Sequence, residues 1–294
     1  MTTRTKPRRR ITAADRRARF EEAQRMMEEG IAKATHSPEN LKAFLAFRAR
    51  FRSYSFRNVV LIQRQRPNAK FCKGYKQWRA VGRQVRKGER GIKIWVPFYR
   101  NPTPEEVEAG HPEDEKVRRF GIGHVFDIEQ CEISEDFAGE PLVYQSPSTP
   151  LEGSGAEALY AAACQVADAI GYPVEESLDL AKEGDCNFTR HRIRVLGNLP
   201  VANKAAVAVH ELAHARAHDP RLQPDVRDLS KPAKELQAEG AAFVACYLLG
   251  LDTSRVSFGY LRSYETEEEQ TQQHFAVIEE LGFWLADQIE TYLS

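Results

Sequence analysis

The spacing of hydrophobic residues predicts three helices before residue 66. The first runs from about Ala13 to Ala34, and its apolar stripe comprises Phe20, Met26, Met27 and Ile31. A second is expected to follow Ser37, because serine caps helix starts and Pro38 suits a first turn. A third is expected from about Ser55 to Gln65, ending before Pro67.

Beyond Lys70 the pattern changes to short β-prone stretches separated by glycine turns. The segment 92–98, IKIWVPF, is typical of a strand, and residues 125–128 are expected to belong to its partner. Between these strands, residues 102–116 are acidic and contain proline, which indicates a long hairpin loop.

The second half of the chain predicts mostly helices. Residues 156–171 form a strongly patterned helix closed by glycine, and residues 185–195 form one or two strands. Three further helices are expected: one through the sequence HELAH, one over about 231–249 and one over about 266–293.

Together these patterns predict an α+β protein of two domains. A disordered basic tail over 1–12 is expected to precede a domain of mixed helices and antiparallel strands over 13–138. Residues 139–156, rich in Gly, Pro and Ser, are interpreted as a linker. A mostly helical domain with a small sheet is expected over 157–294.

Composition indicates a soluble globular protein, with 42% hydrophobic and 29% charged residues. No apolar run reaches the roughly 18–20 residues that a membrane span needs, so no membrane contact is expected. No apolar stretch of the signal-peptide type follows the basic N-terminus, and we expect a cytoplasmic location. The five cysteines form no CxxC pair, so neither a disulfide framework nor a cysteine zinc site is indicated.

The net charge of zero conceals a strong asymmetry. Residues 1–100 hold 27 basic and 7 acidic side chains, a net charge of +20, and the remainder balances it at −20. Such a basic block attracts polyanions, and nucleic acid is the usual partner. The alternative is that the two halves neutralise each other across an internal interface.

The segment AAVAVHELAHARAH carries a zinc-type HExxH motif, formed by His210, Glu211 and His214. Histidines four residues apart lie on one face of a helix, so both imidazoles can reach one ion. Zinc lowers the pKa of a bound water toward about 7, and a neighbouring carboxylate can take its proton. We therefore expect Zn²⁺, or another divalent metal, at the two histidines, with Glu211 as catalytic base.

A catalytic zinc needs a third protein ligand, and the helix over about 231–249 offers two glutamates. Glu235 and Glu239 share a helix face, so one can bind the metal while the other supports a ligating histidine. We favour Glu235 as the ligand, with the reverse assignment open. His218 is expected beside the ligands or at the pocket rim, with ligation as the alternative. Three histidines without ligand spacing are interpreted as structural or surface residues: His124, His191 and His274.

Between residues 51 and 95, Lys and Arg alternate with aromatic residues. Rings that stack on bases and cations that hold phosphates are typical of single-stranded nucleic-acid binding. A position in the core is favoured for any one aromatic, whereas the group as a whole favours contact with DNA. The residues expected to contact DNA are Arg57, Lys73, Tyr75, Lys76, Trp78, Arg79, Arg83, Arg86, Lys87 and Arg90.

Several residues of the first half occur in the order found in a known domain. They are Tyr54, Ser55 and Asn58, then Trp78, Gly82, the turn Lys87-Gly88-Glu89-x-Gly91, and Val125-Phe126-Asp127. Over about residues 15–135 the chain resembles the N-terminal domain of ArdC-type antirestriction proteins, a domain that also occurs in plasmid primase relatives. The second half resembles the metallopeptidase domain paired with it, which is similar to ImmA/IrrE peptidases.

The resemblance implies a domain that binds single-stranded DNA, joined to a gluzincin-like zinc endopeptidase with an unknown protein substrate. It places the metal at His210, His214 and Glu235, and it implies protection of plasmid or phage DNA from host restriction. Two alternatives stay open: a DNA-masking protein with a structural or inactive metal site, and an ImmA-like regulatory protease that cleaves a repressor.

Overall fold

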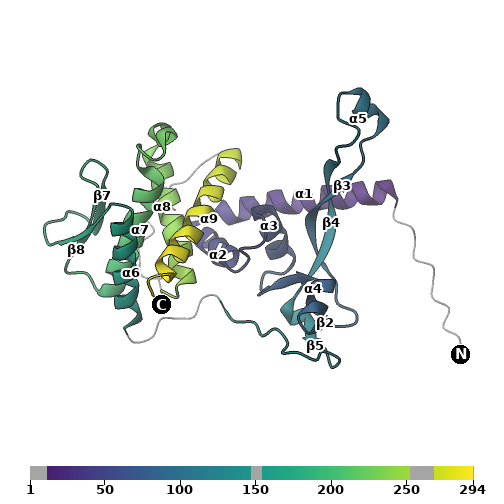
Figure 1. Ribbon diagram of the computed structural model, residues 1–294, viewed down its shortest axis with the longest axis horizontal. Coiled ribbons are helices and arrows are strands. Elements are labelled where there is room, and N and C mark those ends of the chain that lie inside the picture. Colours follow the sequence, from purple (N-terminus) through teal and green to yellow (C-terminus); the bar gives the residue numbers. More distant parts are fainter. Residues whose placement is uncertain (1–11, 147–153, 252–267, 294) are drawn as a thin grey trace, which may run out of the picture. The chain divides into compact units, whose positions relative to one another are not determined.

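The structure is a computed structural model of the 294-residue chain, and it describes residues 12–146, 154–251 and 268–293. The chain divides into two compact units, traced in Figure 1. Unit 1 comprises Met1–Ile31 and Ser53–Tyr144, and unit 2 comprises Ala32–Arg52 and Gln145–Ser294. The predicted α+β fold class is confirmed. None of the described helices is both long and apolar enough to cross a membrane.

Unit 1 combines helices with two small antiparallel sheets. Its helical elements are most of α1 (Ala13–Thr35), α3 (Phe56–Gln65), α4 (Tyr75–Ala80), α5 (Pro104–Glu108) and η1 (Ile128–Gln130). Its strands are β1 (Cys72–Gly74), β2 (Arg83–Val85), β3 (Ile92–Arg100), β4 (Val117–Asp127) and β5 (Cys131–Ile133). The strands form a sheet of order β1-β4-β3 and a pair β2-β5.

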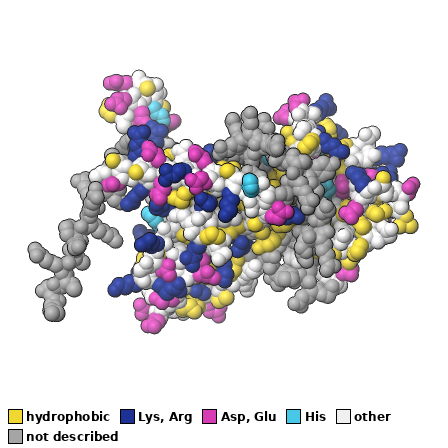
Figure 2. Space-filling view, turned by 180° about the vertical axis from the view of Figure 1, so that it is seen from behind, with side chains coloured by type: hydrophobic (Ala, Val, Ile, Leu, Met, Phe, Trp, Pro, Cys, Tyr) yellow, Lys and Arg dark blue, Asp and Glu magenta, His cyan; other side chains and the backbone are white. Residues whose placement is uncertain are grey.

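The predicted hairpin is the β3–β4 ladder, which is paired from Ile92↔Val125 to Arg100↔Val117. The expected loop at its end contains the short helix α5, whose N-cap Thr103 accepts the N–H of Glu106. Glu106 in turn pairs with Arg100 and Arg119 on the two strands. Figure 2 shows acidic side chains gathered at this end of the hairpin, while Lys and Arg are spread over the rest of unit 1.

Helix α3 covers the open edge of strand β3 with two amide side chains. Asn58 both donates to the Trp95 carbonyl and accepts its N–H, each at 2.8 Å. Gln65 makes the same two-way contact with the Lys93 backbone, at 2.8 and 2.9 Å. These bonds satisfy main-chain groups that a sheet edge would otherwise leave open to another strand.

The segment after Lys70 contains a helix that the sequence pattern did not predict. Helix α4 follows Gly74, whose N–H donates to the Gln77 side chain at 2.9 Å. It turns Trp78 completely inward, where the indole N–H donates to the Phe126 carbonyl at 2.8 Å. Glycine spacing suggested turns between strands, but a local cap and one buried indole stabilise a helical turn instead.

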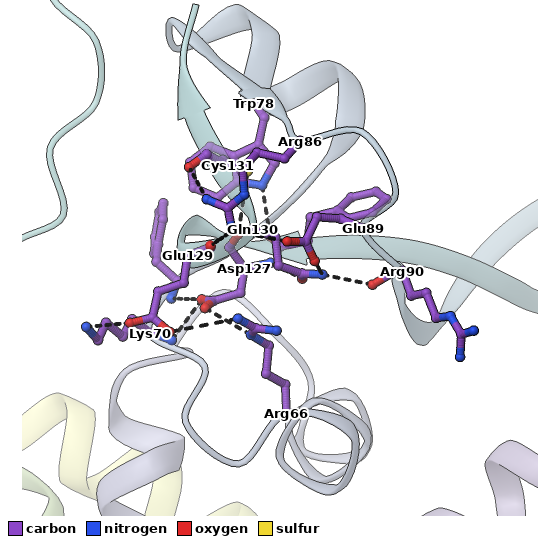
Figure 3. Close-up of polar contacts among 12 residues, drawn as sticks. Arg66, Lys70, Trp78, Arg86, Glu89, Arg90, Asp127, Glu129, Gln130 and Cys131 are labelled. Carbon is purple, nitrogen blue, oxygen red and sulfur yellow. Dashed lines mark hydrogen bonds and ion pairs between the residues drawn. The ribbon is translucent and has the colours of Figure 1, made fainter.

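Asp127 is the centre of a buried polar cluster in unit 1, drawn in Figure 3. Its carboxylate accepts the backbone N–H groups of Lys70 and Phe71 at 2.8 and 2.9 Å. The Arg66 guanidinium lies 3.3 Å from the other oxygen. Since a buried charge requires such partners, Asp127 ties the loop before β1 to the end of β4.

Unit 2 is mostly helical, with a small sheet of order β6-β8-β7. Its helical elements are α2 (Pro38–Ala49), α6 (Gly155–Ala169), α7 (Val201–His218), η2 (Pro224–Asp228), α8 (Lys231–Leu248) and α9 (Glu268–Glu290). Its strands are β6 (Val174–Ser177), β7 (Gly184–Asn187) and β8 (Arg192–Leu196). One continuous core joins α6, α7, α8, α9 and β8, and alanine is its commonest residue.

The predicted domain limits and the two units differ at residues 32–52, which group with unit 2, and within the predicted linker, which the unit boundary divides after Tyr144. The reason for the first difference is α2, whose Phe44 ring packs edge-on against Phe275 of α9 and whose Arg48 pairs with Glu279. The predicted tail lies outside the described residues except for Thr12. The predicted linker 139–156 is described in part, and Leu142 within it donates its N–H to the Val81 carbonyl at 3.0 Å.

Asp127→Asn should destabilise unit 1 by about 2 kcal/mol, because a buried acceptor that holds two N–H groups loses its charge. The matched change Glu129→Gln removes an exposed partner of Lys70 and should cost less than about 1 kcal/mol. Urea unfolding followed by tryptophan fluorescence measures both variants. Equal costs for the two would contradict the central role of Asp127.

Candidate metal centre

Helix α7 carries both histidines of the HExxH motif on one face. The helix begins after Pro200 and is rich in alanine, a strong helix former. The Nε2 atoms of His210 and His214 lie 3.2 Å apart. Two imidazole nitrogens at this separation are placed to share one ion.

Helix α8 brings the third group. Ser230 caps this helix by accepting the N–H of Ala233 at 3.3 Å, which places Glu235 in its first turns. The Glu235 Oε2 atom lies 3.3 Å from Nε2 of His214 and 3.6 Å from Nε2 of His210. All three ligand atoms lie within 4.8 Å of one another. Two imidazoles and one carboxylate are a donor set that suits zinc and related divalent ions.

The charges of the cluster reinforce one another. Burial alone would lower the pKa of His210, but contact with Glu235 and the charges of Glu211 and Glu239 raise it. The hydrogen bond from His210, the largest cause, holds the pKa of Glu235 well below its usual range. Without an ion these charges favour the protonated form of His210 beside an ionised carboxylate, and a metal would compete with that proton.

Glu211 lies on the side of α7 that faces strand β7. Its side chain is 6% exposed. A Cβ atom on Gly184 of β7 would lie 3.1 Å from the Glu211 Cγ and 2.5 Å from Val207, so glycine is required for this approach. The carboxylate is thus held against a strand and close enough to His210 to raise its pKa.

Glu239 lies one helical turn beyond Glu235 and is buried. Among the described residues it is not one of the three groups whose ligand atoms converge. Its charge nevertheless acts on His210. The geometry therefore favours Glu235 as ligand and Glu239 as a supporting charge.

His218 is not one of the three converging groups, but it lies next to one of them, His214. Its Nδ1 lies 2.9 Å from Nδ1 of His214, and its Nε2 lies 2.9 Å from Oε1 of Gln237. The Gln237 nitrogen lies 2.8 Å from Nδ1 of His274 on α9. Burial lowers the pKa of His218 to about 4 and also lowers that of His274, so both are neutral at pH 7.

The sequence patterns did not identify Gln237, and His274 was interpreted as a structural or surface residue. The available signal was a glutamine within the alanine-rich helix α8, because a buried amide must find partners. The partner on α9 could not be predicted, because nothing in the sequence aligns that helix with α8.

The exposed residues predicted to contact DNA lie mostly on and around α4. Tyr75 is 51% exposed. Tyr75, Lys76 and Arg79 stand on the outer side of α4, opposite the buried Trp78. Other members of the predicted set are also accessible to solvent at least in part: Arg57, Lys73, Arg86, Lys87 and Arg90.

For three predicted DNA residues the structure gives other partners. Trp78 is wholly buried, so the prediction that it contacts DNA is wrong. Arg83 donates to the Leu142 carbonyl at 2.6 Å. Arg86 donates to the Glu129 and Cys131 carbonyls, as Figure 3 shows. Both arginines therefore link main-chain segments within unit 1.

We expect one zinc ion to bind per chain. Glu235→Gln should weaken zinc binding by more than about 100-fold, because the loss of a ligand costs more affinity than the loss of a contact to a ligand. Glu239→Gln, the matched change one turn away, should weaken binding by about tenfold or less. Affinity should rise with pH as His210 loses the proton that its raised pKa retains. Competition with a chelating dye measures all three effects, and a larger loss for Glu239→Gln would reverse the ligand assignment.

Comparison with known proteins gives one family match. Residues 19–126 match the N-terminal domain of anti-restriction factor ArdC. Over 80% of its length the chain is 25% identical to the uncharacterized protein pXO2-81 of Bacillus anthracis. The chain spans 44% of that relative, which is less than half of its length.

Two solved structures of the antirestriction protein ArdC from plasmid R388 resemble the chain. The Mn(II)-bound structure has a TM-score of 0.51 at 20% identity, covering 92% of this chain and 98% of the other. The metal-free structure has a TM-score of 0.43 at 21% identity, covering 82% of each chain. The first likeness shows a shared fold. Residues 19–126 of this chain therefore form a domain of the ArdC N-terminal type.

Proposed function

We propose that this chain is a zinc-dependent metalloendopeptidase that binds single-stranded DNA and protects mobile-element DNA from host restriction. The observation that carries the enzymatic part is the convergence of His210, His214 and Glu235, with Glu211 buried beside them. The R388 ArdC protein, which shares this fold, has been solved with Mn(II) bound, and this supports a divalent ion in the present chain. We propose zinc because the donors are two imidazoles and a carboxylate.

The residues of the centre divide the chemistry among themselves. His210, His214 and Glu235 would hold the ion, which supplies a more acidic water and polarises a peptide carbonyl. Glu211 accepts the proton of the attacking water and passes it to the departing amine nitrogen. Its burial beside Gly184 keeps the carboxylate in one place while it does so.

Strand β7 is suited to hold an extended peptide substrate. Among the described residues, β7 pairs with β8 alone and forms one edge of its sheet. Gly184 of β7 lies against Glu211, so this edge runs beside the proposed base. A peptide that adds to the edge by main-chain hydrogen bonds would bring its backbone to the centre.

The basic, partly aromatic surface of α4 and the following turn is the proposed DNA contact. Lys76 and Arg79 are exposed and lie three residues apart, on one face of the helix. Tyr75 offers an exposed ring in the same turn. Stacking on that ring with phosphates at the cations would give binding that is tolerant of sequence. A cytoplasmic location, where incoming DNA meets restriction enzymes, is part of the same proposal.

Glu211→Gln should lower peptide cleavage by at least about 100-fold while zinc affinity and DNA binding stay within about twofold, because only the proton acceptor is lost. The measurement is a gel assay on a generic protein substrate and on the chain itself, with zinc and with or without single-stranded DNA. Glu290→Gln, on the exposed end of α9, is the matched control and should cleave like the unmodified chain.

Cleavage that survives Glu211→Gln would contradict the proposed base. A chain that binds zinc and DNA but cleaves nothing, with or without the substitution, would favour the DNA-masking alternative. Cleavage without any salt-dependent DNA binding would favour the regulatory protease.

Lys76→Glu combined with Arg79→Glu should weaken binding to a labelled oligothymidylate and reduce the salt slope of binding by about 1.4, because two phosphate contacts are lost. Fluorescence anisotropy at several salt concentrations measures this slope. The control is Arg227→Glu with Lys231→Glu, which changes the same charge on exposed residues of unit 2. An equal effect of both pairs would place the DNA contact elsewhere.

A further inference from the structure

A chain of four polar side chains leads from the candidate metal centre to α9. It runs from His214 to His218, from His218 to Gln237, and from Gln237 to His274, with separations of 2.9, 2.9 and 2.8 Å. Exposure is 1% for His218, 4% for Gln237 and 9% for His274. Burial makes the pairing of each donor with an acceptor obligatory.

The amide oxygen of Gln237 sets the direction of this chain. An amide oxygen only accepts, so the facing Nε2 of His218 must carry hydrogen. A neutral His218 then has a bare Nδ1, which accepts from the Nδ1–H of His214. His214 is left with its Nε2 lone pair free of hydrogen, and this is the atom that faces His210 and Glu235. If the Gln237 amide were reversed, so that its nitrogen faced His218, the same chain of hydrogen bonds would place hydrogen on Nε2 of His214. That atom could then not bind a metal.

The geometry points to Gln237 as a positioning residue that fixes the metal-binding tautomer of His214 through His218. This role rests on the metal centre proposed above but not on peptide hydrolysis. The ring of His274 holds the far side of the amide, where the Gln237 nitrogen donates to its Nδ1. Gln237 thus orients a ligand that it does not touch.

The surroundings of Gln237 allow its side chain to be exchanged. Gln237 and His274 border a cavity of about 440 Å³ whose walls include Val226, Leu229 and Trp284. Methionine has nearly the length of glutamine, and a flexible thioether next to open space can settle without overpacking. Glutamate has the same shape and presents an acceptor to both histidines.

Three variants separate positioning from packing. Gln237→Met removes the amide and should raise the Kd for Zn²⁺ by about 10- to 100-fold. Gln237→Glu still accepts from His218 and should stay within about threefold of the unmodified chain. Gln273→Met changes an exposed glutamine on the border of the same cavity and should leave the Kd unchanged. Chelating-dye competition gives the Kd, and thermal unfolding of the metal-free proteins measures any general loss of structure.

Long-range ¹H–¹⁵N spectra of the imidazoles in the metal-free proteins provide a second readout. The unmodified chain should show His214 with hydrogen on Nδ1 and His274 with hydrogen on Nε2. In Gln237→Glu the tautomer of His214 should persist while that of His274 reverses, because a carboxylate accepts on both sides. In Gln237→Met the preference of His214 should be lost.

Two results would overturn the assignment: hydrogen on Nε2 of His214 in the unmodified, metal-free chain, or an unchanged zinc Kd in folded Gln237→Met. The first result is measured on the unmodified chain, so it tests the assignment even if the Gln237→Met protein fails to fold. Neither readout uses peptide cleavage. A chain that binds zinc without cleaving peptides would contradict the proposed activity and leave the role of Gln237 intact.

Discussion

The organisation of unit 2 depends on the close approach of α8 to its neighbouring helices. A Cβ on Gly240 of α8 would lie 2.8 Å from Ile278 of α9, and a Cβ on Gly282 of α9 would lie 2.8 Å from Val244. The buried faces of α7 and α8 consist largely of alanine. Because small side chains allow the helices to pack close together, polar side chains of α8 can contact both α7 and α9. Glu235 reaches α7, and Gln237 reaches both α7 and α9.

Both units use buried polar groups, but to different ends. In unit 1, Asp127 is saturated by backbone N–H groups and an arginine, so its charge serves the fold alone. In unit 2, His210, His214 and Glu235 turn their electron pairs toward one another. Such an arrangement favours a shared proton or cation between the groups. Burying polar atoms is costly unless they find partners. In unit 1 the partners are other groups of the protein, whereas in unit 2 the buried groups converge so that an ion could serve as their partner.

The sequence predicted what local patterns determine and missed what tertiary neighbours determine. Apolar periodicity located α1, α7 and α8, and the four-residue spacing of His210 and His214 predicted that they would meet. Helix α4 was missed because its stability comes from the Gln77 contact to Gly74 and from burial of Trp78. The same burial removed Trp78 from the DNA surface, since the alternation of aromatic and basic residues cannot distinguish an exposed ring from a core ring. His274 was missed because its significance depends on the alignment of α9 with α8.

Part of the positive charge of the first hundred residues is neutralised by ion pairs within unit 2. Arg48 and Arg52 belong to the basic first hundred residues, yet they pair with Glu279 and Asp287 of the acidic helix α9. The Phe283 ring lies beneath both guanidiniums, at 5.3 and 4.6 Å. These pairs attach α2 and the residues just after it to α9, so this part of the basic excess stabilises packing within unit 2. DNA contact is therefore proposed for the exposed cations around α4, where charge and an exposed ring coincide, and not for the first hundred residues as a whole.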